Sequence, residues 1–556
     1  MKSKQRSLLF FTTNLFFIWL ITCLLAVEGA HSEVISKDIR IKCKFEYKNI
    51  TNIRDCFKGN IDHLDECIST PFSSNMSVIK SPMRSNVNFD DLDRIVWKSK
   101  VKPLFMPNEK YDNVAEPSIA SNGTYVFYTA NHYAAKSPIG YATKPAINPI
   151  WNYLDPSFDF KGIFQQGNTT SNNATASNVT QVNLFEADQR TVYDHYHNMY
   201  IWIRLGIPFA EGRTTNILRM AISNDTVNWT VYDFQPRYIF TEPDIIHAHF
   251  DYPEIVISKN YLYITSSVIV GENCEKEYGT IFRVSLSDLR NSLNNLAATI
   301  PFQFLLDRNV TAITPVDGLS NTSMYFGSHL QNNSMMKIYE WKEDSTYVSN
   351  QTVPIDHWNN IHNTEYCGSN PSYSDIWWCK ANTSSRIRSA WFYNNSLNFM
   401  WNSVTTYDNG ATWTPYIDVA TFNLNKNMSY EGNYYIADNL RPWIFGAALS
   451  NDKNDLGVIA YYVTSNNTDP KVNPYLDLAF GIFNQSSNRW DMMPLINSSG
   501  TLPVKDENMR NNYNFGDFIT IRKHPMEKDG YLWDIGAYVI VGKNYYDVDP
   551  YFIMIK

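Results

Sequence analysis

The chain has 556 residues, of which 44% are hydrophobic and 15% aromatic, so it can bury a sizeable core, and this composition argues against a disordered chain. Its 36 tyrosines and 31 phenylalanines favour strands over helices. The net charge is −8 at pH 7 and the sequence has no long basic run, which argues against nucleic acid as the main partner.

Residues 1–32 read as a signal peptide. A basic start precedes an apolar core from Leu15 to Val27, and small residues follow, so we expect cleavage after Gly29 or Ser32. The alternative is an uncleaved signal anchor, because apolar residues begin at Leu8. No later stretch approaches the roughly 20 apolar residues of a spanning helix, so we expect no membrane span after cleavage. The protein is therefore expected to be secreted, or to lie at the cell surface.

Glycosylation sequons support secretion. The motif Asn-x-Ser/Thr marks N-glycosylation acceptors in secreted chains. It recurs along the sequence at Asn49, Asn75, Asn122, Asn168, Asn173, Asn178, Asn224, Asn309, Asn321, Asn350, Asn382, Asn427, Asn484 and Asn497, among others. Not all of these need carry a glycan, because an Asn-rich chain makes some sequons by chance.

The cysteines predict disulfides. Six cysteines follow the signal segment, and an even count in a secreted chain suggests three bridges with 15 possible pairings. They are Cys43, Cys56, Cys67, Cys274, Cys367 and Cys379. A local Cys367–Cys379 bridge is the first expectation. The first three cysteines cannot all pair among themselves. One of them is therefore expected to form a disulfide with Cys274, which would link the N-terminal region covalently to the rest of the chain.

The remaining sequence divides into a Cys-containing N-terminal extension, residues 33–100, and a repetitive region, residues 101–556. The repeat is a strand, a polar turn and a second strand. The second strands begin near residues 124, 199, 261, 323, 397, 456 and 533. This spacing accommodates a four-stranded blade with generous loops, so we predict an all-β, seven-bladed β-propeller. Six blades with one peripheral hairpin is the alternative. Leucines at helical spacing between Ser285 and Leu296 predict one short helix.

The fifth repeat carries the clearest motif. Residues 386–406 predict a hairpin around an Asn-Asn turn, and the following octet has the form Ser/Thr-x-Asp-x-Gly-x-Thr-Trp. Its defining residues are Thr406, Asp408, Gly410, Thr412 and Trp413. The Asp and Thr side chains can bond backbone N–H groups of a turn, and Gly adopts conformations that other residues resist. The octet is expected to stabilise a blade and to do no chemistry. A shorter copy, Ser223–Trp229, lacks the Gly.

This octet resembles the Asp-box of the sialidase-like (BNR) β-propeller superfamily. Further motifs are similar to those of uncharacterised secreted sialidase-like proteins. They are Ala115–Ala120 (AEPSIA), Asp188-Gln189 followed by Ile201-Trp202, Asp251-Tyr252-Pro253, and Gly516-Asp517-Phe518. The resemblance implies a propeller over about residues 110–545. True sialidases also have an early Arg-Ile-Pro, three arginines that grip a carboxylate, an Asp acid/base, and a Tyr nucleophile paired with Glu. This sequence lacks the Arg-Ile-Pro, so sialidase activity does not follow from the resemblance.

The candidate site is a ring of charges. If the first strand of each repeat is innermost, the strand starts meet around the central channel. These starts carry Glu116, Asp188, Asp251, Asp317, Arg388, Arg441 and Asp517. Paired carboxylates could hydrolyse glycosides, and a carboxylate ring could hold Ca²⁺. The competing interpretation is structural, with these side chains capping turns and joining blades. No other cofactor is indicated. Separately, Trp377-Trp378 could stack on sugars, or could plug a disulfide loop.

The leading hypothesis is a non-enzymatic protein that binds glycans or glycoproteins, or self-assembles, in extracellular or cell-surface material. A glycoside hydrolase that uses channel carboxylates is the alternative, and a structural subunit of a filament or coat is a third possibility. An arginine cluster with Tyr and Glu at one channel mouth would favour the hydrolase. A channel plugged by aromatic side chains would favour binding or structure.

Overall fold

The computed structural model describes residues 35–38, 87–89, 94–102, 116–131, 133–138, 150–154, 164–166, 184–207, 216–240, 248–271, 276–294, 300–319, 322–330, 334–358, 386–406, 413–438, 441–465, 474–500, 519–525, 532–542 and 548–556. Within these ranges no helix is both long and apolar enough to cross a membrane. The six mature cysteines and the Trp377-Trp378 pair lie outside them.

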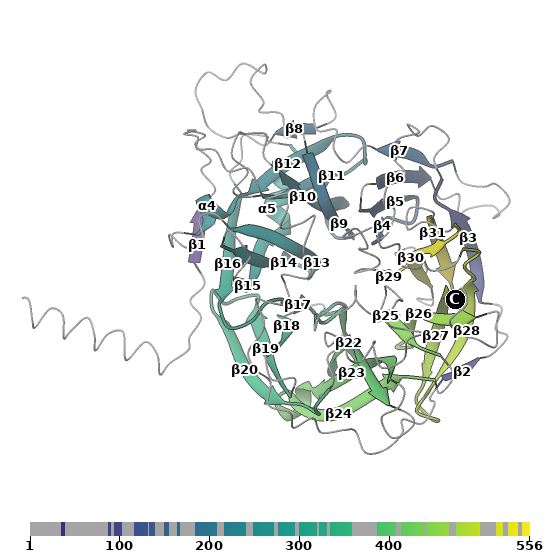
Figure 1. The fold of residues 1–556 in the computed structure, drawn as a ribbon. Coiled ribbons are helices and arrows are strands. Elements are labelled where there is room, and N and C mark those ends of the chain that lie inside the picture. The colour runs from purple at the N-terminus through teal and green to yellow at the C-terminus, as the bar shows by residue number, and fades with distance from the viewer. Residues whose placement is uncertain are drawn as a thin grey trace, which may run out of the picture.

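Seven sheets surround one axis, each with its first strand innermost (Figure 1). Four blades have four strands. From the axis outwards these are β4 (Ser118–Ser121), β5 (Tyr125–Ala130), β6 (Tyr133–Pro138) and β7 (Asn152–Leu154) in the first blade; β17 (Thr314–Pro315), β18 (Ser323–His329), β19 (Met335–Lys342) and β20 (Val348–Pro354) in the fourth; β21 (Ser389–Tyr393), β22 (Ser396–Thr406), β23 (Trp413–Asn423) and β24 (Ser429–Ile436) in the fifth; and β29 (Thr520–Lys523), β30 (Trp533–Ile540), β31 (Val548–Ile555) and β3 (Ile95–Lys100) in the seventh.

Three blades carry a fifth, outermost strand. They are β9 (Leu184–Asp194), β10 (Met199–Ile207), β11 (Ile217–Ser223), β12 (Trp229–Phe234) and β8 (Phe164–Gln166) in the second blade; β13 (His249–Ile257), β14 (Tyr261–Val270), β15 (Lys276–Ser285), β16 (Pro301–Asp307) and β1 (Ile35–Asp38) in the third; and β25 (Trp443–Ser450), β26 (Leu456–Ser465), β27 (Pro474–Asn484), β28 (Arg489–Ile496) and β2 (Val87–Phe89) in the sixth. The inner strands of successive blades touch all the way round, and β29 touches β4.

Seven blades are therefore confirmed, and the six-bladed alternative is wrong, because every predicted hairpin forms the inner part of a sheet of its own. The predicted helix is α5 (Leu286–Ser292), capped by the Ser285 hydroxyl, which accepts from the Asp288 N–H. The described residues also form two further short helices, α4 (Pro236–Ile239) and η1 (Leu424–Lys426).

The N-terminal extension adds outer strands to three blades. Strand β1 pairs with β16, β2 runs parallel to β28, and β3 pairs antiparallel with β31. The last of these pairings closes the ring, since β3 precedes the first blade and completes the seventh. Two backbone hydrogen bonds extend the pairing of β3 with β31. The Val101 N–H donates to the Pro550 carbonyl at 2.8 Å, and the Lys556 N–H donates to the Arg94 carbonyl at 2.9 Å.

The fifth-blade hairpin has the predicted form. Strands β21 and β22 pair antiparallel across Asn394 and Asn395, whose φ angles are 50° and 58°. Positive φ at both turn residues defines the type I′ turn, whose twist matches that of the strands it joins. Strand β22 ends at Thr406 and β23 begins at Trp413 opposite it, so the Asp-box octet joins two neighbouring strands. Asp408, Gly410 and Thr412 lie outside the described residues, so their bonding stays a prediction.

The shorter copy of the octet forms a well-bonded turn between β11 and β12. The Ser223 hydroxyl accepts from the Asp225 and Thr226 N–H groups, and Asp225 Oδ1 accepts from Val227 and Asn228 at 2.8 Å each. Thr226 has φ 58°, so a threonine occupies the left-handed conformation that glycine usually supplies. The turn thus forms side-chain bonds to backbone N–H groups, as predicted for the octet, without a glycine.

Seven of the sequon asparagines named above lie in the described ranges. Four are exposed: Asn224, Asn309, Asn427 and Asn497. Three are half-buried: Asn122, Asn350 and Asn484. The exposed four offer accessible acceptor sites, and their glycosylation stays a prediction.

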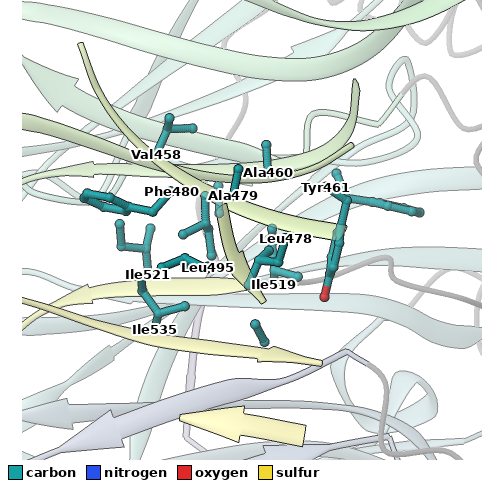
Figure 2. Packing of buried hydrophobic residues seen from close by; sticks show 14 of the residues in the cluster. Val458, Ala460, Tyr461, Leu478, Ala479, Phe480, Leu495, Ile519, Ile521 and Ile535 are labelled. Atoms are coloured by element: carbon teal, nitrogen blue, oxygen red, sulfur yellow. The ribbon is translucent and has the colours of Figure 1, made fainter. Parts of the chain in front are cut away.

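Apolar side chains fill the space between blades. Figure 2 shows this packing between the sixth and seventh blades, where Phe480 of β27, Leu495 of β28 and Ile521 of β29 meet. Trp533 of β30 lies 5.5 Å from Phe480, centroid to centroid, and its indole N–H donates to the Leu449 carbonyl at 3.0 Å. Adjacent blades are thus held by close packing and by hydrogen bonds between blades.

The packing between the seventh and first blades leaves no room for an added methyl group at Gly536. A Cβ atom there would lie 2.8 Å from Ile119 Cγ2. We expect Gly536→Ala to lower the free energy of unfolding by about 1–3 kcal/mol, because overpacking a rigid core displaces its neighbours. Chemical denaturation would measure this. If Ile119 is the obstacle, the double variant with Ile119→Ala loses less than the sum of the single losses; additive losses would contradict the explanation.

Candidate axial site

Three inner strands are distorted near the axis. The ladders of β9, β13 and β25 each shift register, and a residue with positive φ lies at each shift: Asp188 (52°), Tyr252 (51°) and Phe445 (50°). Glu116, just before β4, has φ 62°. A β-bulge changes the direction in which side chains point. A non-glycine residue with a positive φ angle raises the free energy of the folded backbone. At the bulge of β13, the consecutive residues Asp251 and Tyr252 both contact Arg386.

The second and third blades meet through a buried ion pair. Arg190 of β9 binds the Glu254 carboxylate of β13, and its Nε donates to the Pro253 carbonyl at 3.3 Å. Their side chains are 5% and 14% exposed, so water screens this pair little. One carboxylate oxygen of Asp188 accepts from the Tyr252 N–H at 3.2 Å, which ties the two bulges together.

The fifth blade contributes two arginines that reach past the fourth blade to the third. Arg386 Nη2 lies 3.1 Å from Asp251 and 2.9 Å from Glu277. Its guanidinium also lies over the Tyr252 ring, 4.5 Å from the centroid. Arg388 Nη1 donates to the Tyr252 hydroxyl at 3.2 Å. Tyr252 is therefore fixed by one arginine at its ring and by another at its hydroxyl.

A further ion pair crosses the ring. Arg522 of β29, in the seventh blade, binds Asp317, which follows β17 in the fourth. We call the ten residues joined by these contacts the axial cluster: Asp188, Arg190, Asp251, Tyr252, Glu254, Glu277, Asp317, Arg386, Arg388 and Arg522. Its side chains come from the second, third, fourth, fifth and seventh blades. Arg386, Asp251, Glu277, Arg522 and Asp317 are 17–29% exposed, so a ligand can reach this side of the cluster.

The surroundings of Glu254 shift the pKa of its carboxyl group. Burial raises the pKa of its carboxyl above the ordinary value, against the opposing effect of Arg190, Arg522 and Arg388. Three guanidinium groups thus act on one carboxylate, and desolvation still prevails. A raised pKa favours the protonated carboxyl, which is the form in which a general acid acts.

The predicted ring of charges is partly brought together. Asp188, Asp251, Asp317 and Arg388 belong to the axial cluster. Glu116 is buried beside the first inner strand. Arg441 lies 3.7 Å from Asp438 and over the Tyr462 ring at 5.6 Å, both in or next to the sixth blade. Asp517 lies outside the described residues.

No metal site is evident in the described part of the chain, where no group of three or more His, Cys, Asp or Glu side chains could hold an ion. Within the axial cluster, Asp251, Glu254, Glu277 and Asp317 bind guanidinium groups. Calcium binding by the predicted carboxylate ring stays a prediction.

Arg190, Tyr252, Glu254, Glu277, Arg386 and Arg522 were not among the residues that the sequence predicted for the ring of charges. Arg190 lies two residues after Asp188, but the register shift at Asp188 breaks the alternation that places such residues on one face of a strand. The placement of Tyr252 and Glu254 likewise depends on the bulge at Tyr252-Pro253. The strand that carries Arg522 contains no recognisable motif, so the sequence did not predict its ion pair with Asp317 across the ring.

The sequence matches no family model and no curated protein. Solved structures that resemble the fold include an α-L-arabinanase of Penicillium chrysogenum (8% identity, 83% of this chain and 98% of that one, TM-score 0.37) and the NanB sialidase of Streptococcus pneumoniae (9%, 79% and 82%, 0.36). A protein of unknown function from Dyadobacter fermentans also matches (9%, 83% and 99%, 0.38). A sialidase is thus among the structural neighbours. With TM-scores below 0.5, these likenesses do not bear on the activity of this chain.

The Arg190–Glu254 pair predicts a pH-dependent loss of stability. Arg190→Gln removes a cation that lowers the pKa of Glu254, so that pKa rises further above its value in the unfolded chain. A carboxyl raised in this way loses stability as pH rises. We expect a loss of about 3 kcal/mol at about pH 7.5 and a smaller one at about pH 5, by chemical denaturation.

Lys426→Gln is the matched control, since it breaks an exposed lysine–glutamate pair, with Glu431, away from the axial cluster. Its loss should stay below about 1 kcal/mol at both pH values. If Arg190→Gln lowers the free energy of unfolding equally at both pH values, or more in acid, then Glu254 is not the group that causes the pH dependence.

Proposed function

We propose that the protein is a secreted β-propeller that binds glycans or glycoproteins at the axial cluster. The observation that carries this proposal is a partly exposed array of guanidinium and carboxylate groups, built from five blades around Tyr252. Sugar hydroxyls both donate and accept hydrogen bonds, and this array offers acceptors and donors side by side. Secretion rests on the signal segment and the sequons; self-assembly remains a further expectation of the sequence.

The rigidity of the array supports binding. Each guanidinium is oriented by a partner: Arg190 by Glu254, Arg522 by Asp317, and Arg386 by two carboxylates and the Tyr252 ring. Side chains that are already ordered lose little entropy when a ligand arrives. Because the partners belong to different blades, the propeller as a whole sets the spacing of the array.

A second candidate is glycoside hydrolysis. Arg190, Arg388 and Arg522 act on Glu254, and Tyr252 lies two residues before it, which is the arginine cluster with Tyr and Glu that we expected of a hydrolase. The raised pKa of Glu254 suits a general acid, and a second carboxylate such as Asp188 would serve as its partner. Binding stays first because Asp251, Glu254, Glu277 and Asp317 all bind guanidinium groups, whereas hydrolysis needs a carboxylate directed at the sugar.

A glycan-array screen of the full mature chain, run together with a fluorogenic glycoside panel, tests both candidates. We expect binding without turnover. Arg386→Gln should weaken that binding about 10- to 100-fold, because a charge-assisted hydrogen bond contributes about 1.5–3 kcal/mol. Lys426→Gln should leave binding unchanged.

Turnover that disappears in Asp188→Asn or Asp251→Asn would replace the binding proposal with the hydrolase. Binding that survives Arg386→Gln at full strength would place the glycan elsewhere on the propeller. Neither binding nor turnover would leave the structural subunit as the better account.

A further inference from the structure

We propose that the axial cluster selects uncharged sugars and excludes sugars that carry a carboxylate. This inference rests on the proposed glycan-binding function and specifies its ligand. It follows from how the arginines of the cluster are already engaged.

The first observation is that the protein's own carboxylate occupies the arginine cluster. Glu254 binds Arg190 and also experiences the charges of Arg388 and Arg522. Its side chain is only 14% exposed. A ligand carboxylate would need the position that Glu254 holds, and Glu254 would be left in a buried place with fewer cations. Removing the partner of a buried charge is strongly unfavourable.

The second observation concerns the more exposed arginines. Arg522 binds Asp317, and Arg386 binds both Asp251 and Glu277. An incoming carboxylate at either arginine would compete with a carboxylate already fixed by the fold. It would also approach that carboxylate closely, and like charges at contact distance repel.

The third observation is the overall charge. The axial cluster has five carboxylates, at Asp188, Asp251, Glu254, Glu277 and Asp317, and four guanidinium groups, at Arg190, Arg386, Arg388 and Arg522. With all groups ionised it therefore carries a net negative charge, which opposes an anion and does not oppose a neutral ligand.

The test compares matched sugars that differ in one charge. The wild-type full chain is titrated with pairs of oligosaccharides, each pair consisting of a neutral oligosaccharide and the same oligosaccharide carrying a terminal sialic acid or uronic acid. We expect the neutral sugar to bind at least about ten-fold more tightly. Equal or tighter binding of the acidic sugar would overturn this inference and leave the glycan-binding proposal in place. Failure to bind either sugar would overturn both.

The cause is tested with Glu254→Gln, which removes the internal anion and preserves the shape of the side chain. We expect the variant to gain at least about ten-fold in affinity for the acidic sugar. Glu431→Gln makes the same chemical change at an exposed pair away from the cluster and should gain nothing. If Glu254→Gln does not fold, Asp317→Asn releases Arg522 and should give a gain of the same sign. A folded variant without any gain would overturn the explanation.

Discussion

The structure depends on one strand pairing, that of β3 with β31. A ring of seven sheets closes only if its first and last blades are joined. Here β3, which precedes the first blade in sequence, is the outermost strand of the seventh blade. The pairing holds Arg94 against Lys556, 462 residues away in sequence. No blade can move outwards without breaking this ladder or the packing between neighbouring blades. The inner strands are therefore held at fixed positions around the axis.

That constraint explains why so many charges can be buried near the axis. An isolated arginine or carboxylate in such surroundings would cost several kcal/mol, so each must find a partner. The inner strands bring partners from different blades into reach, as with Arg522 and Asp317 across the ring. The bulges in β9 and β13 lie where Asp188 accepts from the Tyr252 N–H and where Arg190 binds Glu254. The closed ring holds Asp188 and Tyr252 in backbone conformations with positive φ, which non-glycine residues adopt only at a cost in free energy.

Much of the fold could be predicted from sequence because it is periodic. Each blade begins with two apolar runs around a polar turn, and Asn394-Asn395 specifies its hairpin by local conformational preference alone. The axial cluster was harder to predict from the sequence. Asp188 and Asp251 were found because the sequence placed them near strand starts, although β9 begins at Leu184 and β13 at His249. The contacts of the cluster join residues far apart in sequence, from 64 positions for Arg190 and Glu254 to 205 for Arg522 and Asp317. A register shift such as that at Tyr252 has no marker in local composition, and it decides which side chains face the axis.

The late completion of the seventh blade has a consequence for how the chain acquires its structure. Strand β3 emerges from the ribosome long before β31, the strand with which it pairs, so it must wait unpaired while six blades form. Contacts between such distant segments make folding slow, because the loop must close before the pairing is gained. During that interval an unpaired strand offers its backbone to other chains. The step that joins the first and last blades is thus the one at which a nascent chain of this protein is most exposed to misassembly.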